Sequence, residues 1–298
     1  MDFIGKINVP AALALALALS VSCSAGDDGN DGWTEPMKVA TYNIQYDNNS
    51  ENAGKWENRK ELMKRMLTDC GFDIFGAQEP YKFQVEDIAS WFPEYGWVGT
   101  SIAGESVKER IHYNPIFYRK DRFTVLENGS FWYSETPDVV NSKGWDSYSV
   151  RMCNWAKFQD KHTGKVFYHF NSHFDHIGET ARVESAKLLV AKVKEIAGDM
   201  PAFCTADYNA DQTSAPYQII MMSSLMDSWS RAESRSGDSC RSYNGYSQAT
   251  ASSSDIRIDH VFVSRGTRVL TWSLLNKSYD GKYASDHNPI TIQWSLPR

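Results

Sequence analysis

The sequence predicts an α/β fold in which two stacked β-sheets carry helices on their outer faces. Short β-type apolar runs outnumber helical segments, the helical segments occur in both halves of the chain, and no linker or repeat interrupts residues 33–298. Sheets and helices with one apolar face each bury those faces best when they pack as layers. We therefore expect one layered domain over residues 37–298.

Two segments have the amphipathic spacing of helices. In residues 56–70 (WENRKELMKRMLTDC) the apolar side chains stand at positions 56, 63, 66, 67 and 70. Residues 179–197 repeat this spacing with Val183, Ala186, Val190, Val193 and Ala197. Both segments are predicted to be helices that cover a sheet.

The other apolar runs are short, which is typical of β-strands. The predicted strands are residues 37–42, 73–77, 115–118, 150–158, 165–171, 202–205, 258–263 and 289–294.

The first residues have the pattern of an export signal. The apolar run at 9–21 follows a single cation, Lys6, and is shorter than the roughly 20 apolar residues that span a bilayer. Small residues then lead into Cys23, which resembles a bacterial lipoprotein signal in which Cys23 becomes the lipidated N-terminus. We predict a signal peptide over residues 1–22 and a flexible tether over residues 23–36. The alternatives are plain secretion and a buried N-terminal helix.

This pattern predicts an exported protein, an outer-membrane or periplasmic lipoprotein that contacts the membrane only through its N-terminal lipid. The alternative is a secreted protein. The four remaining cysteines, at positions 70, 153, 204 and 240, have no paired spacing, so we expect free thiols and no cysteine-based zinc site.

Charge and composition narrow the class of function. Aromatic residues make up 13% of the chain, which is a globular composition. The chain carries 31 Lys and Arg against 37 Asp and Glu, a net charge of −6, and no basic cluster. A protein that binds long nucleic acid needs a basic face, so we expect no strong basic surface for nucleic acid. An enzyme that meets phosphate through a bound cation is still allowed.

Short polar clusters follow the apolar runs, where a rigid sheet would fix side chains at strand ends. They are TYNIQ with Asn43, GAQEP with Glu79, SVRMCNWAKF with Arg151, NSHFDH with His173, TADYNAD with Asp207 and Asn209, IDHVFVS with Asp259, and ASDHNP with Asp286 and His287. The chain has no G-x-S-x-G elbow, phosphate-binding glycine loop, HEXXH motif or dinucleotide fingerprint.

Carboxylate and amide oxygens without thiolates favour a hard cation such as Mg²⁺, Mn²⁺ or Ca²⁺. Asp207 and Asn209 stand two residues apart at a strand end, so both point to one side and can orient and deprotonate a water molecule. An Asp–His pair can hold an imidazolium against a phosphate oxygen. Together these parts predict metal-assisted hydrolysis of a phosphate ester.

The ordered series of clusters resembles the endonuclease/exonuclease/phosphatase superfamily. The resemblance rests on Asn43, Gln78-Glu79, His173, Asp207-x-Asn209, Asp259 and Ser285-Asp286-His287, and further on Trp56-x-x-Arg59, residues 115–118, residues 134–137 and residues 143–146. It implies a four-layer αββα sandwich of two mainly antiparallel sheets with outer helices. It places the site at one rim between the sheets.

The resemblance also implies a metal site. Glu79 would be the main ligand of Mg²⁺, Mn²⁺ or Ca²⁺, with Asn43 and Asp286 near the metal. Arg151 would bind the substrate phosphate bidentately, and Asn43 is a second substrate-binding candidate.

The implied reaction is in-line attack by water without a covalent intermediate. Asp207 would orient or deprotonate the water with help from Asn209. His287, paired with Asp259, would stabilise the charge that develops on the phosphoryl group, and His173 would contact the phosphate from the other side.

Several positions allow two interpretations. Tyr113 is either a phosphate-contacting phenol or a core aromatic. Asp175 orients either His173 or an arginine, and Arg151 either binds phosphate or pairs with a structural aspartate. His176 is either a solvated side chain or a substrate contact.

Two residues depart from the family pattern. Ala206 replaces the glycine that usually precedes the Asp-x-Asn motif. His260 stands where a tyrosine often follows the late aspartate.

The sequence does not identify the substrate class, because proteins of this fold act on many different phosphate esters. We expect a phosphodiesterase or phosphatase that is a monomer. The alternatives are a nuclease acting on extracellular DNA or RNA, a sphingomyelinase-like phospholipid hydrolase, and a non-catalytic binding lipoprotein. A Ser-His-Asp esterase would need an elbow that the chain lacks.

Overall fold

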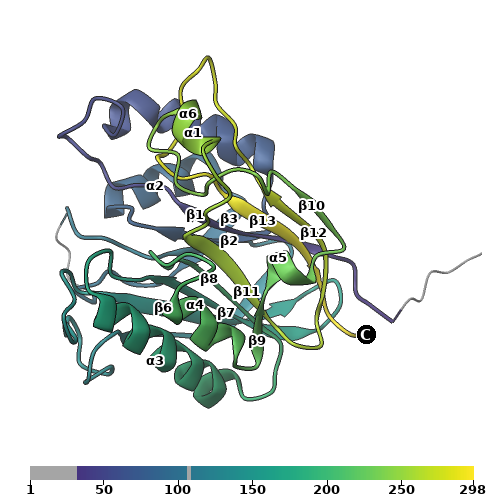
Figure 1. Cartoon of the computed structure of the whole chain (residues 1–298). Coiled ribbons are helices and arrows are strands. Elements are labelled where there is room, and N and C mark those ends of the chain that lie inside the picture. The colour runs from purple at the N-terminus through teal and green to yellow at the C-terminus, as the bar shows by residue number, and fades with distance from the viewer. Residues whose placement is uncertain (1–31, 106–108) are drawn as a thin grey trace, which may run out of the picture. The chain divides into compact units, whose positions relative to one another are not determined.

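The computed structural model describes residues 32–105 and 109–298, which form two stacked sheets between helices (Figure 1). The first sheet has the strand order β10-β12-β13-β1-β2-β4-β3, and the second has the order β5-β6-β7-β8-β11-β9. Most neighbouring strands are antiparallel, and the parallel pairs are β1–β2, β10–β12 and β7–β8. The predicted sandwich of two mainly antiparallel sheets with outer helices is confirmed.

The strands of the first sheet are β1 (Met37–Asn43), β2 (Ile74–Gln78), β3 (Tyr95–Val98), β4 (Ile116–Arg119), β10 (Ser234–Ser236), β12 (Arg268–Leu274) and β13 (Ile290–Ser295). Those of the second are β5 (Phe123–Trp132), β6 (Met152–Asp160), β7 (Val166–His173), β8 (Ala202–Asp207), β9 (Leu225–Asp227) and β11 (Asp259–Ser264). The helices are α1 (Trp56–Cys70), α2 (Lys82–Trp91), α3 (Glu179–Ala197), α4 (Ala215–Met221), α5 (Ser228–Arg231) and α6 (Gln248–Ala251).

Three apolar clusters fill the spaces between the layers. One lies between the sheets and includes Val39, Phe158 and Phe203. A second packs α1 and α2 on the first sheet, and a third packs α3 and α4 on the second. Both predicted helices, α1 and α3, have the predicted bounds because each has a well-defined apolar stripe.

Polar side chains also join the two sheets beneath one rim. Gln78 Nε2 of β2 donates to Asn171 Oδ1 of β7 over 2.6 Å. Asn171 Nδ2 in turn donates to the backbone oxygen of Ala77 over 2.8 Å. A Cβ at Gly76 would lie only 2.2 Å from Thr205 Oγ1, so this position needs glycine for the sheets to approach so closely. These bonds fix the spacing of the sheets directly below the polar strand ends.

The N-terminal predictions are only partly within the described residues. The signal peptide at 1–22, with Cys23 after it, lies outside them. The predicted tether at 23–36 is wrong in its last part, because Trp33 pairs with Pro297 and Thr34 N donates to Leu296 O over 2.8 Å. Thr34 is buried there. In the described ranges no helix has the length and apolar character needed to cross a membrane, and the four described cysteines are free thiols.

A buried arginine connects α1 to the loops that follow β1 and precede β13. Arg59 is 1% exposed and stacks on Trp56, with its guanidinium carbon 5.0 Å from the ring centre. Its nitrogens donate only to backbone oxygens, which belong to Ile44, Gln45, Tyr46, Gly54 and Ala284. The planar guanidinium therefore holds two loops that are far apart in the sequence.

We expect Arg59→Lys to lower the free energy of unfolding by roughly 3 kcal/mol, because an ammonium group cannot reach all five carbonyl oxygens and leaves some of them buried without a donor. Urea denaturation of the purified protein measures this loss. Glu61→Ala, at an exposed position of the same helix, is the control and should change stability by less than about 0.5 kcal/mol. Equal stability of the two variants would contradict the clamping role of Arg59.

Candidate active site

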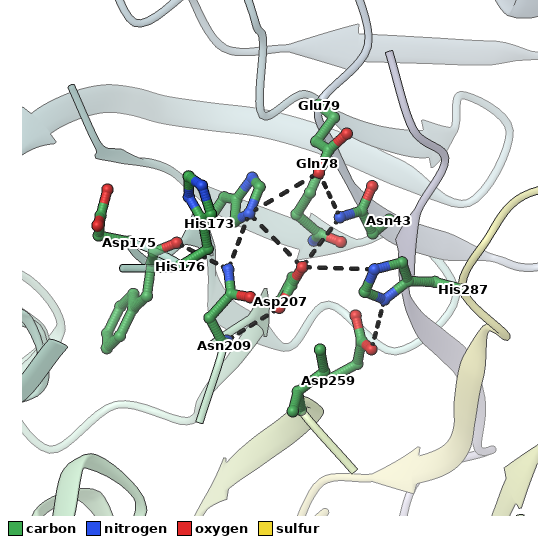
Figure 2. A network of polar contacts seen from close by, with 12 residues as sticks. Asn43, Gln78, Glu79, His173, Asp175, His176, Asp207, Asn209, Asp259 and His287 are labelled. Carbon is green, nitrogen blue, oxygen red and sulfur yellow. Dashed lines mark hydrogen bonds and ion pairs between the residues drawn. The ribbon is translucent and has the colours of Figure 1, made fainter. Parts of the chain in front are cut away.

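Strand pairing brings the predicted polar residues to one edge of the sandwich. In the first sheet Asn43 lies opposite Gln78 in the parallel pair β1–β2. In the second sheet Asp207 lies between His173 of β7 and Asp259 of β11. The carboxyl ends of two parallel pairs, one in each sheet, therefore meet at the same rim (Figure 2).

The backbone is strained where three of these strands end. Gln45, Glu79 and Asn209 have positive φ angles of 52°, 76° and 46°. Such conformations cost about 1–3 kcal/mol for residues other than glycine and persist where the surroundings enforce them. Their occurrence together at one rim indicates a functional site rather than three independent turns.

The Asn43 side chain links two carboxylates that come from different sheets. Its Nδ2 donates to Glu79 Oε1 over 2.9 Å and to Asp207 Oδ2 over 3.0 Å (Figure 2). The Gln45 N–H donates to Asn43 Oδ1 over 3.0 Å, which fixes the orientation of the amide. Tyr46 N–H donates to Glu79 Oε2 over 3.2 Å, so the Glu79 carboxylate is held at both oxygens.

A buried imidazole lies between two aspartates. His287 Nδ1 is 2.8 Å from Asp259 Oδ2, and its Nε2 is 3.7 Å from Asp207 Oδ2. Burial by itself lowers the pKa of His287, but the charges of Asp259 and Asp207 outweigh this and hold that pKa well above its ordinary value. His287 is therefore an imidazolium near neutral pH, as the predicted Asp259–His287 pair requires.

In Asp207, unlike His287, the surroundings favour the neutral form of the side chain. Burial, together with the charge of Asp259, raises the pKa of Asp207 to about 7. The N–H of Asn209 donates to Asp207 Oδ1 over 2.9 Å and leaves Oδ2 facing His287 and His173. A carboxylate with a pKa near neutrality is suited to exchange a proton with water.

His173 is neutral, because burial lowers its pKa well below the ordinary value. Its Nε2 accepts from Asn209 Nδ2 over 3.2 Å and lies 3.5 Å from Asp207 Oδ2. Asn209 Nδ2 also donates to Phe174 O over 3.0 Å. The amide of Asn209 thus fixes the position of His173 relative to Asp207.

Asp286 lies on the side of the site formed by the loop after β1. Its Oδ2 accepts from Gln45 Nε2 over 2.7 Å. Burial raises the pKa of Asp286 to about 6, and the charge of Glu79 adds to the effect.

Arg151 both pairs with an aspartate and lines the cavity. Its Nε is 3.4 Å from Asp175 Oδ2, and its Nη2 is 3.0 Å from His176 Nδ1. Asp175 also accepts from four backbone N–H groups, at Tyr148, Ser149, Ile177 and Gly178. Asp175 therefore orients an arginine rather than His173, and it organises the loops beside Arg151.

These side chains surround a cavity of about 840 Å³. Glu79, Arg151, His173, Asp207, Asn209, Asp286 and His287 line it, whereas Asn43 and Asp259 bond to the lining residues from behind. His176 lines it beside Arg151, but His260 lies elsewhere, 3.1 Å from the Ala210 carbonyl oxygen.

Of the two interpretations of Tyr113, the structure shows the core aromatic and contradicts the phosphate-contacting phenol. Tyr113 is 6% exposed, packs edge-on against Trp97 and belongs to the core under α1 and α2. Its neighbour His112 lines the cavity instead and stacks on Tyr46 at 5.1 Å between ring centres. The expected substrate-binding role of Tyr113 is therefore replaced by a packing role.

Several lining residues were absent from the predicted set, namely Gln45, Tyr46, Arg110, His112, Tyr148 and Tyr243. Gln45 stands within the TYNIQ cluster and His112 next to Tyr113. The sequence therefore identified the segments that reach the cavity, but not which side chain of each segment lines it. Tyr148 and Tyr243 carry no sequence signal that separates them from other surface tyrosines.

The donor atoms fit a hard divalent cation. Glu79, His173 and Asp207 offer ligand atoms within 4.8 Å of one another. Asp207, Asp259 and His287 lie equally close, but the imidazolium of His287 has no lone pair for a cation. The carboxylate oxygens that face the cavity are buried or partly buried, and burial, with a smaller contribution from neighbouring carboxylates, raises the pKa of Asp207 and of Asp286, so a cation there would offset both effects. Asp286 is in neither group, so its predicted place near the metal stays a prediction.

Two stacked sheets that hold oxygen ligands and an imidazolium at one rim define a class of phosphoester hydrolases. This chain belongs to the Endonuclease/Exonuclease/phosphatase family, whose profile matches residues 40–287. The family resemblance predicted from the sequence is thereby confirmed.

Solved structures and a viral relative agree with this assignment. An endonuclease/exonuclease/phosphatase from Bacteroides vulgatus is 35% identical, with a TM-score of 0.82 over 88% of this chain and 100% of that one. The mannosyl-6-phosphatase of Bacteroides thetaiotaomicron is 36% identical, with a TM-score of 0.80 over 87% of this chain and 99% of that one. An uncharacterised protein of Acanthamoeba polyphaga mimivirus is 30% identical over 59% of this chain and 68% of its own length.

We expect Glu79→Ala and His287→Ala each to reduce phosphate-ester hydrolysis by at least about a hundredfold, because the first removes the carboxylate expected to hold the cation and the second removes the imidazolium expected to stabilise the reacting phosphate. Steady-state kinetics with p-nitrophenyl phosphate or its bis ester measures the loss. Glu127→Ala, at an exposed position of β5, is the control and should retain wild-type activity. Activity within a few-fold of wild type in either site variant would contradict the assigned site.

The pH dependence of metal-free stability follows from Asp207. Its pKa of about 7 in the folded protein exceeds the ordinary value, so between about pH 4 and pH 7 the folded state holds a proton that the unfolded chain has lost. This contribution to stability is lost as the pH rises through 7. A divalent cation bound beside Asp207 would replace the proton, so we expect Mg²⁺ to raise Tm by about 5 °C or more at pH 8 and by much less at pH 5.

Differential scanning fluorimetry with Mg²⁺ and with EDTA at the two pH values checks this expectation. Asp207→Asn, which cannot titrate, should shrink the difference between the two pH values. An equal gain in Tm at pH 5 and pH 8 would refute the coupling between the carboxylate and the cation.

Proposed function

We propose that this protein is a divalent-metal-dependent phosphatase that removes a phosphoryl group from a phosphorylated sugar. The observation that carries the proposal is the pair of carboxylates joined through Asn43, Asp207 buried and Glu79 partly exposed, that opens into a cavity large enough for a small ligand. The mannosyl-6-phosphatase that shares 36% of its residues over nearly its whole length supports the choice of a sugar phosphate.

In this proposal Glu79 would hold the metal, with Asn43 and Asp286 as further candidates. A divalent cation held by these residues would polarise a phosphoryl oxygen and lower the pKa of a bound water. Mg²⁺ is the first choice, because the ligands are hard oxygen atoms, and Mn²⁺ or Ca²⁺ are the alternatives.

Asp207 accepts the proton of the attacking water through a remaining lone pair of Oδ2, the oxygen that Asn43 Nδ2 orients, while Asn209 N–H holds Oδ1. Attack occurs in line with the leaving sugar oxygen, so the reaction needs no covalent intermediate. Among the described residues that line the cavity there is no cysteine and one serine, Ser149, whose backbone N–H donates to Asp175 Oδ2 over 3.0 Å.

The charge that develops on the phosphoryl group is stabilised from two sides. His287, kept protonated by Asp259, faces it from one side, and Arg151 faces it from the other. His173 is neutral and serves as a hydrogen-bonding partner for phosphate or water. Preorganised donors of this kind account for most of the rate gain in such sites.

Two observations favour a small sugar ester over a polynucleotide. Arg110 and Arg151 are the only lysine or arginine side chains among the described residues that line the cavity, and Arg110 is already paired with Asp47 at 3.1 Å. Exposed aromatic rings flank the cavity, Tyr148 at 66% and Tyr243 at 38% exposure. A sugar ring can pack its C–H face on such a ring, whereas a nucleic acid chain needs a basic track.

The location is part of the same proposal. An exported lipoprotein, held to a membrane by a lipid on Cys23 and monomeric, would act on phosphate esters outside the cytoplasm. The support is the sequence of residues 1–23 alone.

We expect Mg²⁺-dependent release of phosphate from mannose 6-phosphate, with kcat/KM at least about tenfold above that for bis-p-nitrophenyl phosphate, because the cavity offers few cations for a second esterified chain. A panel with plasmid DNA, RNA and sphingomyelin, assayed with Mg²⁺ and with EDTA, makes the comparison. Asp207→Asn is the inactive control.

Hydrolysis of the diester alone would favour a nuclease or phospholipid hydrolase over a phosphatase. Activity that survives EDTA would contradict the metal dependence. No activity on any ester, with the fold intact, would indicate a binding protein.

A further inference from the structure

Gln45 reaches two parts of the candidate site at once. Its backbone N–H donates to Asn43 Oδ1 over 3.0 Å, and its side-chain Nε2 donates to Asp286 Oδ2 over 2.7 Å. The first bond sets the amide that holds Glu79, and the second sets the direction of the Asp286 carboxylate. Gln45 is 6% exposed, so these bonds face little competition from water.

The backbone of Gln45 is clamped in its left-handed conformation. Its carbonyl oxygen accepts from Arg59 Nη2 over 2.6 Å and from Gln84 Nε2 over 2.9 Å. Both donors are buried at 1% and 0% exposure. The position of Gln45 is therefore set by the fold before any ligand binds.

A tyrosine holds the other end of the Gln45 amide. The Asp286 carboxylate can only accept, so it takes the NH₂ group, and Tyr246 Oη donates over 2.6 Å to Gln45 Oε1 on the opposite side. Without this hydroxyl Gln45 Oε1 loses its donor, and the amide is held at one end only. Tyr246 thus keeps the donor group of Gln45 in place against Asp286.

The same segment is tied to the backbone of Asp286. The N–H groups of Asn244 and Gly245 donate to Asp286 O over 2.7 Å and 3.0 Å. Tyr246 N donates to Asn244 Oδ1 over 2.7 Å and has a positive φ of 61°. The chain of bonds therefore closes on itself, from the Asp286 backbone through Tyr246 and Gln45 to the Asp286 carboxylate.

Tyr246 does not contact the proposed substrate site. It lines a different cavity, of about 370 Å³, with Arg59, Lys282 and Tyr283, and is not among the described residues that line the main cavity. The effect of its hydroxyl on the site therefore passes through Gln45, to which that hydroxyl donates.

We propose that Tyr246 and Gln45 form a hydrogen-bond relay that positions the Asp286 carboxylate for cation binding. Both are positioning residues, and Gln45 also positions Asn43. The inference rests on the proposed metal-dependent function, since it assigns Asp286 to the cation. It implies that removal of the Tyr246 hydroxyl weakens cation binding, although this hydroxyl touches neither the substrate nor the metal.

The test measures cation binding directly. Isothermal titration of the purified full chain with Mn²⁺ should give about 10-fold weaker binding for Tyr246→Phe, which removes only the hydroxyl, and at least as large a loss for Gln45→Met. The double variant should bind as Gln45→Met does, because the tyrosine acts only through Gln45. In the hydrolysis assay, Tyr246→Phe should need more Mn²⁺ for half-maximal rate, while KM for the ester at saturating Mn²⁺ stays unchanged.

Tyr283→Phe is the matched control. Tyr283 lines the same cavity, and its hydroxyl lies within hydrogen-bond distance of Asn276 Oδ1, at 2.8 Å, and of Gln248 Oε1 rather than of Gln45. It should leave Mn²⁺ affinity at the wild-type value. Circular dichroism and Tm confirm that each variant is folded.

Unchanged Mn²⁺ affinity in a folded Tyr246→Phe protein would overturn the relay, as would a full further loss in the Gln45→Met background. A wild-type protein that binds no Mn²⁺ would also overturn it. A wild-type protein that binds Mn²⁺, with the expected variant pattern, but hydrolyses no phosphate ester would contradict the proposed function and leave the relay standing.

Discussion

The candidate site depends on one amide that bridges the two sheets. Asn43 stands at the end of β1 in the first sheet, and its Nδ2 donates both to Glu79, just past β2, and to Asp207, at the end of β8 in the second sheet. Two carboxylates that would repel each other are thereby held a short distance apart. Every other element of the site is arranged around this pair.

Polar contacts between the two sheets, just below the rim, explain how the bridge made by Asn43 can be rigid. Polar bonds between Gln78 and Asn171 join the sheets there, and Gly76 lets them approach more closely than any side chain would permit. Buried polar groups that are satisfied in this way specify one spacing, because a shift of either sheet would leave donors unpaired. The same spacing sets the distance across the site, so the precision of the chemistry originates in the core of the sandwich.

Sequence patterns predicted the parts of this molecule whose signals are local. Helices α1 and α3 have clear apolar stripes, and the series of polar clusters identified the residues at the rim. Strand β5 was missed because it lies at a sheet edge, is largely exposed and carries a register shift between Val125 and Glu127, which breaks its alternation. Helix α2 was missed because its stripe is narrow, with only Gln84, Val85 and Ile88 buried.

The missed site residues have a different cause. Whether His112 or Tyr113 faces the cavity depends on the local path of a loop, and the two choices look alike in the sequence. Tyr246 meets Gln45 across 201 positions of chain, through a left-handed backbone at both residues that no composition or periodicity reveals. Motifs thus identify groups that react, while the groups that orient them are set by tertiary contacts. The orientation of a carboxylate decides whether it serves as a ligand. Related sites of this family can therefore differ in the residues that orient their carboxylates, while their motifs stay the same.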